Sequence, residues 1–177
     1  MSDERMPPAA DATADPAAEL IAELTRRGLR IAVAESLTGG LVTAELTRIP
    51  GASVVVNGGI VAYDTSVKRS LLGVPADLLA AVGAVHPEVA RRMADGVRSA
   101  LAVDDRPADL GLATTGVAGP DPQDGKAVGT VYIGVATADG ADAIALQLAG
   151  AGGRDAIRAA TVRAAIDAAL ARVRERN

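Results

Sequence analysis

Apolar and polar positions follow two different periodicities along the chain, and the changes of periodicity divide it into helices and strands. Apolar residues spaced three and four apart predict amphipathic helices, whereas short unbroken apolar runs predict buried strands. Capping and turn residues set the boundaries. The pattern predicts helices over residues 16–28, 38–48, 64–73, 75–82, 87–102 and the later part of 150–176, strands over 29–35, 53–63 and 108–115, and a hairpin over 128–149.

The order of these elements, α-β-α-β-α-α-α-β-β-β-α, predicts an α/β fold. Helices between strands imply crossover connections and parallel strands, while a hairpin turning at Asp139-Gly140 requires one antiparallel strand. We expect a three-layer α/β/α sandwich around a mixed, mostly parallel five-stranded sheet. The adjacent glycines Gly58 and Gly59 within a strand indicate a bulge or a close backbone approach. One domain over residues 16–177 accounts for the pattern, and the acidic, Pro- and Ala-rich residues 1–15 predict a disordered tail.

The composition excludes several classes of function. Apolar residues make up 49% of the chain but aromatic residues only 1%, so the core is aliphatic and stacking platforms for single-stranded nucleic acid are scarce. A net charge of −4 argues against duplex binding, and we expect no nucleic-acid partner. With no cysteine and only His86 as histidine, thiolate and multi-histidine metal sites are excluded, and we expect no metal and no cofactor. No apolar run is long enough to span a bilayer, and the N-terminus lacks a secretory core, which predicts a cytoplasmic protein without a membrane partner.

Hydroxyl-bearing residues gather where predicted strands end. Ser36 and Thr38 follow the first strand, Tyr63 follows the second, and Thr114 and Thr115 end the third. Ligands of open α/β sheets bind outside the carboxyl ends of the strands. We therefore expect these residues to converge on one site.

The stretch AESLTGG, residues 34–40, has two interpretations. Ser36 is a good N-cap for the helix predicted from residue 38, and the glycines suit a tight turn. The same geometry would place its hydroxyl among free backbone N–H groups, which bind phosphate or stabilise an oxyanion. On these residues alone the capping interpretation is the stronger.

A serine nucleophile needs a base, and Lys68 is a candidate. The chain has two lysines, Lys68 and Lys126, beside sixteen arginines. A lysine loses its proton readily when buried, which an arginine does not. The alternative for Lys68 is a surface pair with Asp64 four residues earlier.

Other residues carry weaker signals. Lys126 is expected in solvent, and His86, directly before Pro87, is expected at the start of a helix. The loop GVAGPDPQDG is either a surface turn or a flap over a ligand. The glycine-rich AGAGGR before the last helix is either a flexible connection or an anion site at Arg154.

The ordered motifs AESLTGG, IPGASVVVNGGIVAYDTSVKRSLLGV, GAVHPEVARRMADGVR, TTGVAGPD and VGTVYIGVAT resemble the CinA C-terminal domain family over residues 16–175. Its enzymatic members are stand-alone PncC-type nicotinamide-nucleotide amidases. The resemblance implies hydrolysis of nicotinamide mononucleotide, a small-molecule pyridine nucleotide, to nicotinic acid mononucleotide and ammonia. It also implies a homo-oligomer.

The resemblance further implies roles for single residues. Ser36 matches the nucleophile, Lys68 its base, Tyr63 a tyrosine that assists them, and Thr115 a hydroxyl near the substrate amide. Further positions match the substrate pocket: Glu35, Thr38, Gly39, Gly40, Gly116, Ala118, Gly119 and Arg154.

The chain departs from the family pattern at four positions. Leu37 replaces a common cysteine, His86 a common serine, Pro122 a glycine and Gly153 an acidic residue. Two alternatives to the nucleotide amidase stay open. One is a non-catalytic nucleotide-binding module linked to competence or recombination, and the other is an amidase for a different carboxamide.

Overall fold

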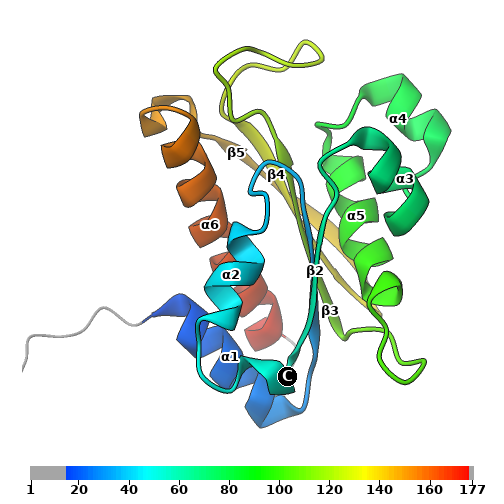
Figure 1. Ribbon diagram of the computed structural model, residues 1–177, viewed down its shortest axis with the longest axis vertical. Coiled ribbons are helices and arrows are strands. Elements are labelled where there is room, and N and C mark those ends of the chain that lie inside the picture. The colour runs from blue at the N-terminus through cyan, green and yellow to red at the C-terminus, as the bar shows by residue number, and fades with distance from the viewer. Residues whose placement is uncertain (1–14, 176–177) are drawn as a thin grey trace, which may run out of the picture.

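The computed structural model describes residues 15–175 (Figure 1). The helices and strands follow the predicted order, with two short 3-10 turns added. The helices are α1 (Pro16–Arg27), α2 (Leu41–Thr47), α3 (Thr65–Leu72), α4 (Ala76–Val82), α5 (Pro87–Ala100) and α6 (Arg154–Glu175), with 3-10 turns η1 (Ala52–Val54) and η2 (Ala149–Ala151). The strands are β1 (Ile31–Glu35), β2 (Val56–Val61), β3 (Leu110–Gly116), β4 (Thr130–Thr137) and β5 (Gly140–Gln147).

The five strands form one sheet in the order β2-β1-β3-β4-β5. Strand β1 is parallel to β2 and to β3, whereas the pairs β3-β4 and β4-β5 are antiparallel. The expectation of a mixed five-stranded sheet is confirmed, but "mostly parallel" is wrong. Strand β4 lies between β3 and β5 and runs opposite to both, so this one strand makes two of the four pairs antiparallel.

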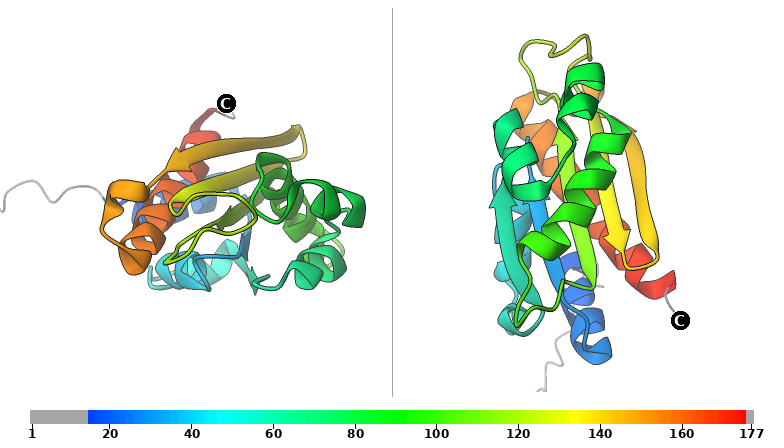
Figure 2. Two further views of the ribbon diagram at one scale, coloured as in Figure 1. Left: turned by 90° about the horizontal axis from the view of Figure 1, so that it is seen from above. Right: turned by 90° about the vertical axis from the view of Figure 1, so that its right-hand side faces the viewer.

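Helices cover both faces of the sheet, which confirms the three layers. Helices α1, α2 and α6 lie on one face and α3, α4 and α5 on the other (Figures 1 and 2). Strand β1 alternates between these two cores: Ile31 and Val33 pack with α1 and α6, while Ala32 and Ala34 pack with α5. Burial on both faces explains why β1 reads as an unbroken apolar run.

The paired glycines of β2 serve both purposes that the sequence indicated. The register shifts between Val56 and Gly58, which leaves Asn57 as a bulge against β1. At Gly59, an added Cβ would lie 2.0 Å from the hydroxyl oxygen of Thr43 in α2. A side chain at this position would push α2 away from the sheet.

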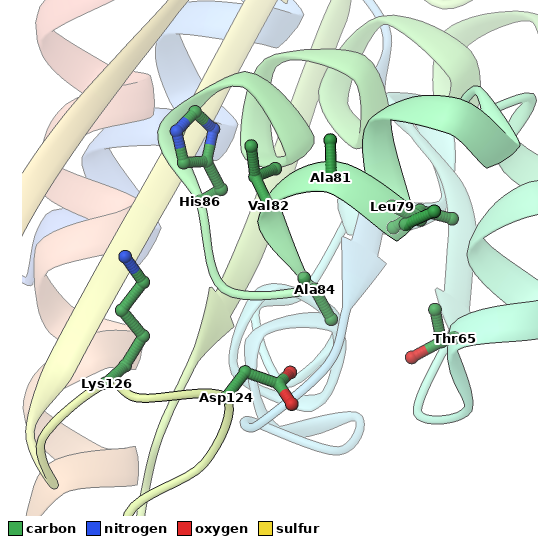
Figure 3. Close-up of a pocket in the computed structure, with 10 residues that line it drawn as sticks. Thr65, Leu79, Ala81, Val82, Ala84, His86, Asp124 and Lys126 are labelled. Atoms are coloured by element: carbon green, nitrogen blue, oxygen red, sulfur yellow. The ribbon is translucent and has the colours of Figure 1, made fainter.

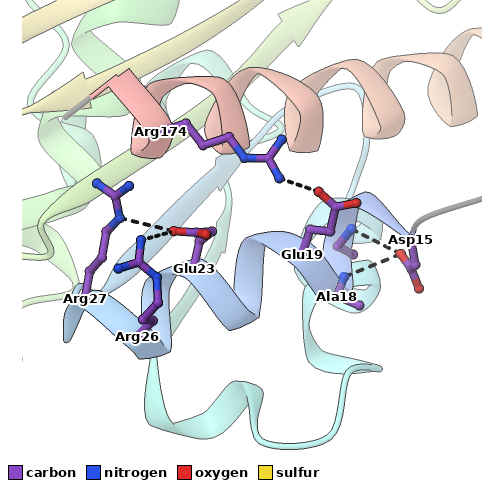
Figure 4. Close-up of polar contacts among 8 residues, drawn as sticks. Asp15, Ala18, Glu19, Glu23, Arg26, Arg27 and Arg174 are labelled. Atoms are coloured by element: carbon purple, nitrogen blue, oxygen red, sulfur yellow. Dashed lines mark hydrogen bonds and ion pairs between the residues drawn. The ribbon is translucent and has the colours of Figure 1, made fainter. Parts of the chain in front are cut away.

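The expected tail lies outside the described residues, except for its last residue, Asp15. Its carboxylate caps α1 and pairs with Arg48 at 2.7 Å, and the arginine lowers the pKa of that carboxyl. Figure 4 shows this end of the molecule, where Arg174 of α6 also pairs with Glu19 of α1. Such exposed pairs stabilise a fold only slightly, so the apolar contact between α1 and α6 carries the packing. Within residues 15–175, every helix is too short or too polar to cross a membrane.

Candidate functional site

The carboxyl ends of β1, β2 and β3 meet at one edge of the sheet because β1 is parallel to both neighbours. A cavity of about 160 Å³ opens there. Its walls come from the turn after β1, the segment after β2, the end of β3 and the start of α6. The lining residues are Ser36, Leu37, Tyr63, Thr65, Lys68, Ala84, Val85, Thr115, Gly116, Val117, Ala118, Gly119, Asp121, Gln123 and Arg154.

Ser36 and Lys68 contact each other in this cavity. The Nζ atom of Lys68 lies 3.1 Å from Ser36 Oγ and also donates to the carbonyl oxygens of Ala62 (2.7 Å) and Tyr63 (3.4 Å). The Lys68 side chain is only 1% exposed. The alternative of a surface pair with Asp64 is therefore wrong, since Asp64 caps α3 instead.

Burial changes the proton affinity of Lys68. Removal of the ammonium from water lowers the pKa of Lys68 from 10.5 to about 8, and the charge of Asp64 offsets this only in part. A substantial fraction of Lys68 is therefore neutral near pH 8. A lysine in this state can accept the proton of a neighbouring hydroxyl.

Glu35, not Ser36, caps helix α2. The helix begins at Leu41, and the Glu35 carboxylate accepts hydrogen bonds from the backbone N–H groups of Gly40, Val42 and Thr43 and from the Thr43 hydroxyl, at 2.7 to 3.0 Å. The capping interpretation of Ser36 is wrong. The N–H groups at the start of α2 are also occupied, so they do not form the anion site that the sequence suggested.

Leu37 lines the cavity beside Ser36, whereas Thr38, Gly39 and Gly40 lie outside its lining. Thr38 is fully buried, and its hydroxyl contacts that of Thr114 at 2.8 Å. Gly39 and Gly40 have φ values of +60° and +101°, which other residues adopt rarely. The structure therefore places Thr38 and the two glycines where they shape the turn, and Glu35 where it holds the helix.

Thr115 and Tyr63 both line the cavity but differ in exposure. Thr115 is 1% exposed and donates its hydroxyl proton to the Ala84 carbonyl at 2.8 Å, so its oxygen remains free to accept. Tyr63 is 60% exposed, and its hydroxyl accepts from Arg154 at 2.9 Å. The Tyr63 hydroxyl thus belongs to the rim, while its backbone carbonyl binds Lys68.

Arg154 bridges two walls of the rim. Besides Tyr63 it binds the Gly119 carbonyl oxygen at 2.6 Å, which joins the start of α6 to the loop after β3. The departures Pro122 and Gly153 are exposed, and neither lines the cavity. The positively charged guanidinium of Arg154 is therefore accessible at the mouth of the cavity.

The cavity includes polar residues that sequence reasoning missed. Asp121 and Gln123 come from the loop that was interpreted as a turn or a flap, and Thr65 follows the cap of α3. The side chains of this loop follow no periodic pattern that would single out Asp121 or Gln123. Thr65 gives no signal of its own, because a residue after an N-cap is usually explained by the helix alone.

A second, shallower hollow of about 740 Å³ adjoins the cavity and shares Thr65 and Ala84 with it. Figure 3 shows Lys126 and His86 on one side of this hollow and Asp124 nearer to Thr65. His86 caps α5, accepting from the Glu88 N–H at 3.2 Å, as expected of a residue at a helix start. Among residues 15–175, no cluster of three acidic or histidine side chains is placed to hold a metal.

Comparison with known proteins matches this chain and its fold to one family. The model of the CinA C-terminal domain matches residues 13–173. A CinA-like protein of Frankia casuarinae is 51% identical over 144 residues, which is 81% of this chain and 32% of that protein. The chain thus spans about a third of the length of the curated relatives it matches.

Solved structures agree over nearly the whole chain. The competence/damage inducible protein CihA from Agrobacterium tumefaciens superposes with a TM-score of 0.80 at 34% identity, covering 92% of this chain and 98% of that one. A CinA superfamily protein from Klebsiella pneumoniae superposes with a TM-score of 0.83 at 27% identity, covering 91% and 97%.

Proposed function

The chain belongs to the CinA C-terminal domain family, and we propose that it is an amidohydrolase that converts nicotinamide mononucleotide to nicotinic acid mononucleotide and ammonia. The observation that carries this proposal is the contact of 3.1 Å between Ser36 Oγ and Nζ of the buried Lys68 at the end of the parallel strands. A hydroxyl beside a lysine of lowered pKa is an activated nucleophile.

The hydrogen bonds of Lys68 suit its neutral form. A neutral amine has two N–H donors and one lone pair. As an ammonium, Lys68 donates to Ser36 Oγ and to the carbonyls of Ala62 and Tyr63; in the neutral form the two carbonyls take the two donors, and the lone pair then faces the Ser36 hydroxyl. The site therefore orients Lys68 as a base toward Ser36.

The proposed reaction proceeds through an acyl-enzyme. Ser36 Oγ attacks the carboxamide carbon while its proton moves to Lys68, and Lys68 then protonates the amide nitrogen, which leaves as ammonia. Water attacks the nicotinoyl ester, gives a proton to Lys68, and Lys68 returns it to Ser36. Lys68 handles these protons, and the Tyr63 hydroxyl, which accepts from Arg154 and keeps its own proton to donate, assists the transfer to the leaving ammonia.

The oxyanion formed in this reaction needs donors. Among residues 15–175, the backbone N–H groups of Leu37 and Thr38 have no acceptor, although both residues are at least 96% buried. Buried N–H groups are rarely left unpaired. We assign the N–H group of Leu37, which lines the cavity, to the oxyanion, in place of the start of α2.

The size of the cavity suits a single ring. Its volume of about 160 Å³ fits a pyridine carboxamide but leaves the ribose and phosphate outside. Arg154 at the mouth is the proposed contact for the phosphate, because arginine binds phosphate with two parallel hydrogen bonds. The implied homo-oligomer stays a prediction.

Ammonia release from nicotinamide mononucleotide tests the proposal. Ser36→Ala and Lys68→Ala are each expected to lower kcat by at least about a thousandfold, with Lys126→Ala as the matched control at wild-type rate. Nicotinamide and NAD serve as alternative substrates. Binding of the mononucleotide by a wild-type protein that releases no ammonia would support the non-catalytic module instead.

A further inference from the structure

The turn Ser36–Gly40 is held from two sides by charged side chains. On one side Glu35 accepts the N–H groups at the start of α2, as described above. On the other side Arg158 of α6, more than a hundred residues later, donates to two carbonyl oxygens of the turn. Its Nε binds Leu37 O at 3.1 Å, and one of its terminal nitrogens binds Thr38 O at 3.3 Å.

We infer that Arg158 is a positioning residue that holds the turn in which the Leu37 N–H faces the oxyanion; this inference rests on the proposed function. The carbonyl of Leu37 and the N–H of Thr38 belong to one planar trans peptide, so they point in opposite directions. When Arg158 fixes that carbonyl on the α6 side, the N–H is fixed on the side away from α6.

The preceding peptide is fixed in the same way. Its carbonyl, on Ser36, accepts the N–H of Gly39 at 3.1 Å, so the N–H of Leu37 points away from Gly39. The Leu37 side chain is anchored in a small apolar cluster with Ala118, Val131 and Ile157, the residue directly before Arg158. Both unpaired N–H groups therefore have their direction set before substrate arrives.

Arg158 is suited to this task. Its side chain is 27% exposed, and its remaining terminal nitrogen pairs with Asp155 one turn earlier, which restrains the guanidinium. Lysine offers a single nitrogen and cannot span both carbonyls in this planar arrangement. Because the oxyanion exists only in the transition state, loss of orientation lowers kcat rather than raising KM.

The experiment compares Arg158→Met and Arg158→Lys with Arg163→Met, an exposed arginine on the same helix. With nicotinamide mononucleotide, Arg158→Met is expected to lower kcat by about 10- to 100-fold with KM within about twofold, and Arg158→Lys to restore part of the loss. Arg163→Met keeps the wild-type kcat. Thermal unfolding of each variant identifies any that fails to fold.

A second measurement does not depend on turnover. The Gly39 and Leu41 amides are bonded within the turn, to Ser36 O and Thr38 O, and their hydrogen exchange is followed by NMR. Faster exchange in Arg158→Met than in Arg163→Met supports the inference. Equal exchange, or equal kcat in an active protein, overturns it. A wild type that releases no ammonia defeats the proposed function, while the exchange data still decide whether Arg158 holds the turn.

Discussion

The floor and the rim of the cavity are built differently. The floor, formed by Ser36, Lys68 and Thr115, lies on strand ends and on an inward-facing turn of α3, and Lys68 and Thr115 are 1% exposed. The rim, formed by Tyr63, Arg154 and the loop after β3, is exposed and joined by hydrogen bonds between side chains and loop backbone.

This difference separates chemistry from recognition. Packed elements hold reacting groups to within fractions of an ångström, while loops tolerate change and adapt to ligands. The departures Pro122 and Gly153 are exposed and do not line the cavity, whereas the departure Leu37 does line it, and the floor residues Ser36, Lys68 and Thr115 match the family motifs. Floor variants should therefore change rate and stability, and rim variants should change affinity.

The pH dependence of Lys68 is a large effect that would sharpen this contrast. The pKa of Lys68 is lower in the folded protein than in the unfolded chain, so burial of its charge costs stability at neutral pH, and that cost disappears as pH rises through about 8 toward 10.5. The unfolding free energy of the wild type relative to Lys68→Met should rise by about 2 kcal/mol between pH 7 and pH 9.5.

Urea unfolding at several pH values measures this difference, with Lys126→Met as control. The value of kcat/KM should rise with a midpoint near pH 8, since it reports the free enzyme. If the unfolding free energy of the wild type relative to Lys68→Met does not change with pH, Lys68 stays charged in the folded protein.

The cap formed by Glu35 gives an effect of similar size. Glu35→Gln keeps the size but places an NH₂ group against N–H donors, so two of four hydrogen bonds are lost. We expect a loss of about 2 to 3 kcal/mol in unfolding free energy. The matched control is Glu45→Gln within α2 itself, which removes only an exposed pair with Arg48 and should cost less than about 0.5 kcal/mol. Equal losses in the two variants would show that α2 does not depend on this cap.

The rim gives the smallest of the three effects. Arg154→Gln is expected to raise KM for nicotinamide mononucleotide about tenfold with kcat within about threefold, because a charged hydrogen bond to phosphate is lost. The effect should vanish with nicotinamide riboside, which lacks the phosphate. Lys126→Gln in the neighbouring hollow is the control. If Lys126→Gln raises KM as much as Arg154→Gln does, the phosphate lies in that hollow. A large fall in kcat for Arg154→Gln would contradict the division of roles between floor and rim.

The fold was largely predictable because its signals are local. The apolar run of β1, the cap Asp64 and the start of α5 at Pro87 each follow from a few neighbouring residues, and the observed element order agrees with them. The proportion of parallel pairs was not predictable, since it depends on which strands lie beside β4.

The sequence by itself determined which residue types lie at the strand ends and that lysine is rare, and so made Ser36 and Lys68 candidates. Only the tertiary structure decided that Lys68 is buried against Ser36, because that contact joins residues 32 apart through parallel strand pairing. It also decided that Glu35 and Arg158 hold the turn. A carboxylate beside a serine, or an arginine on a surface helix, reveals its partner only when distant elements pack together.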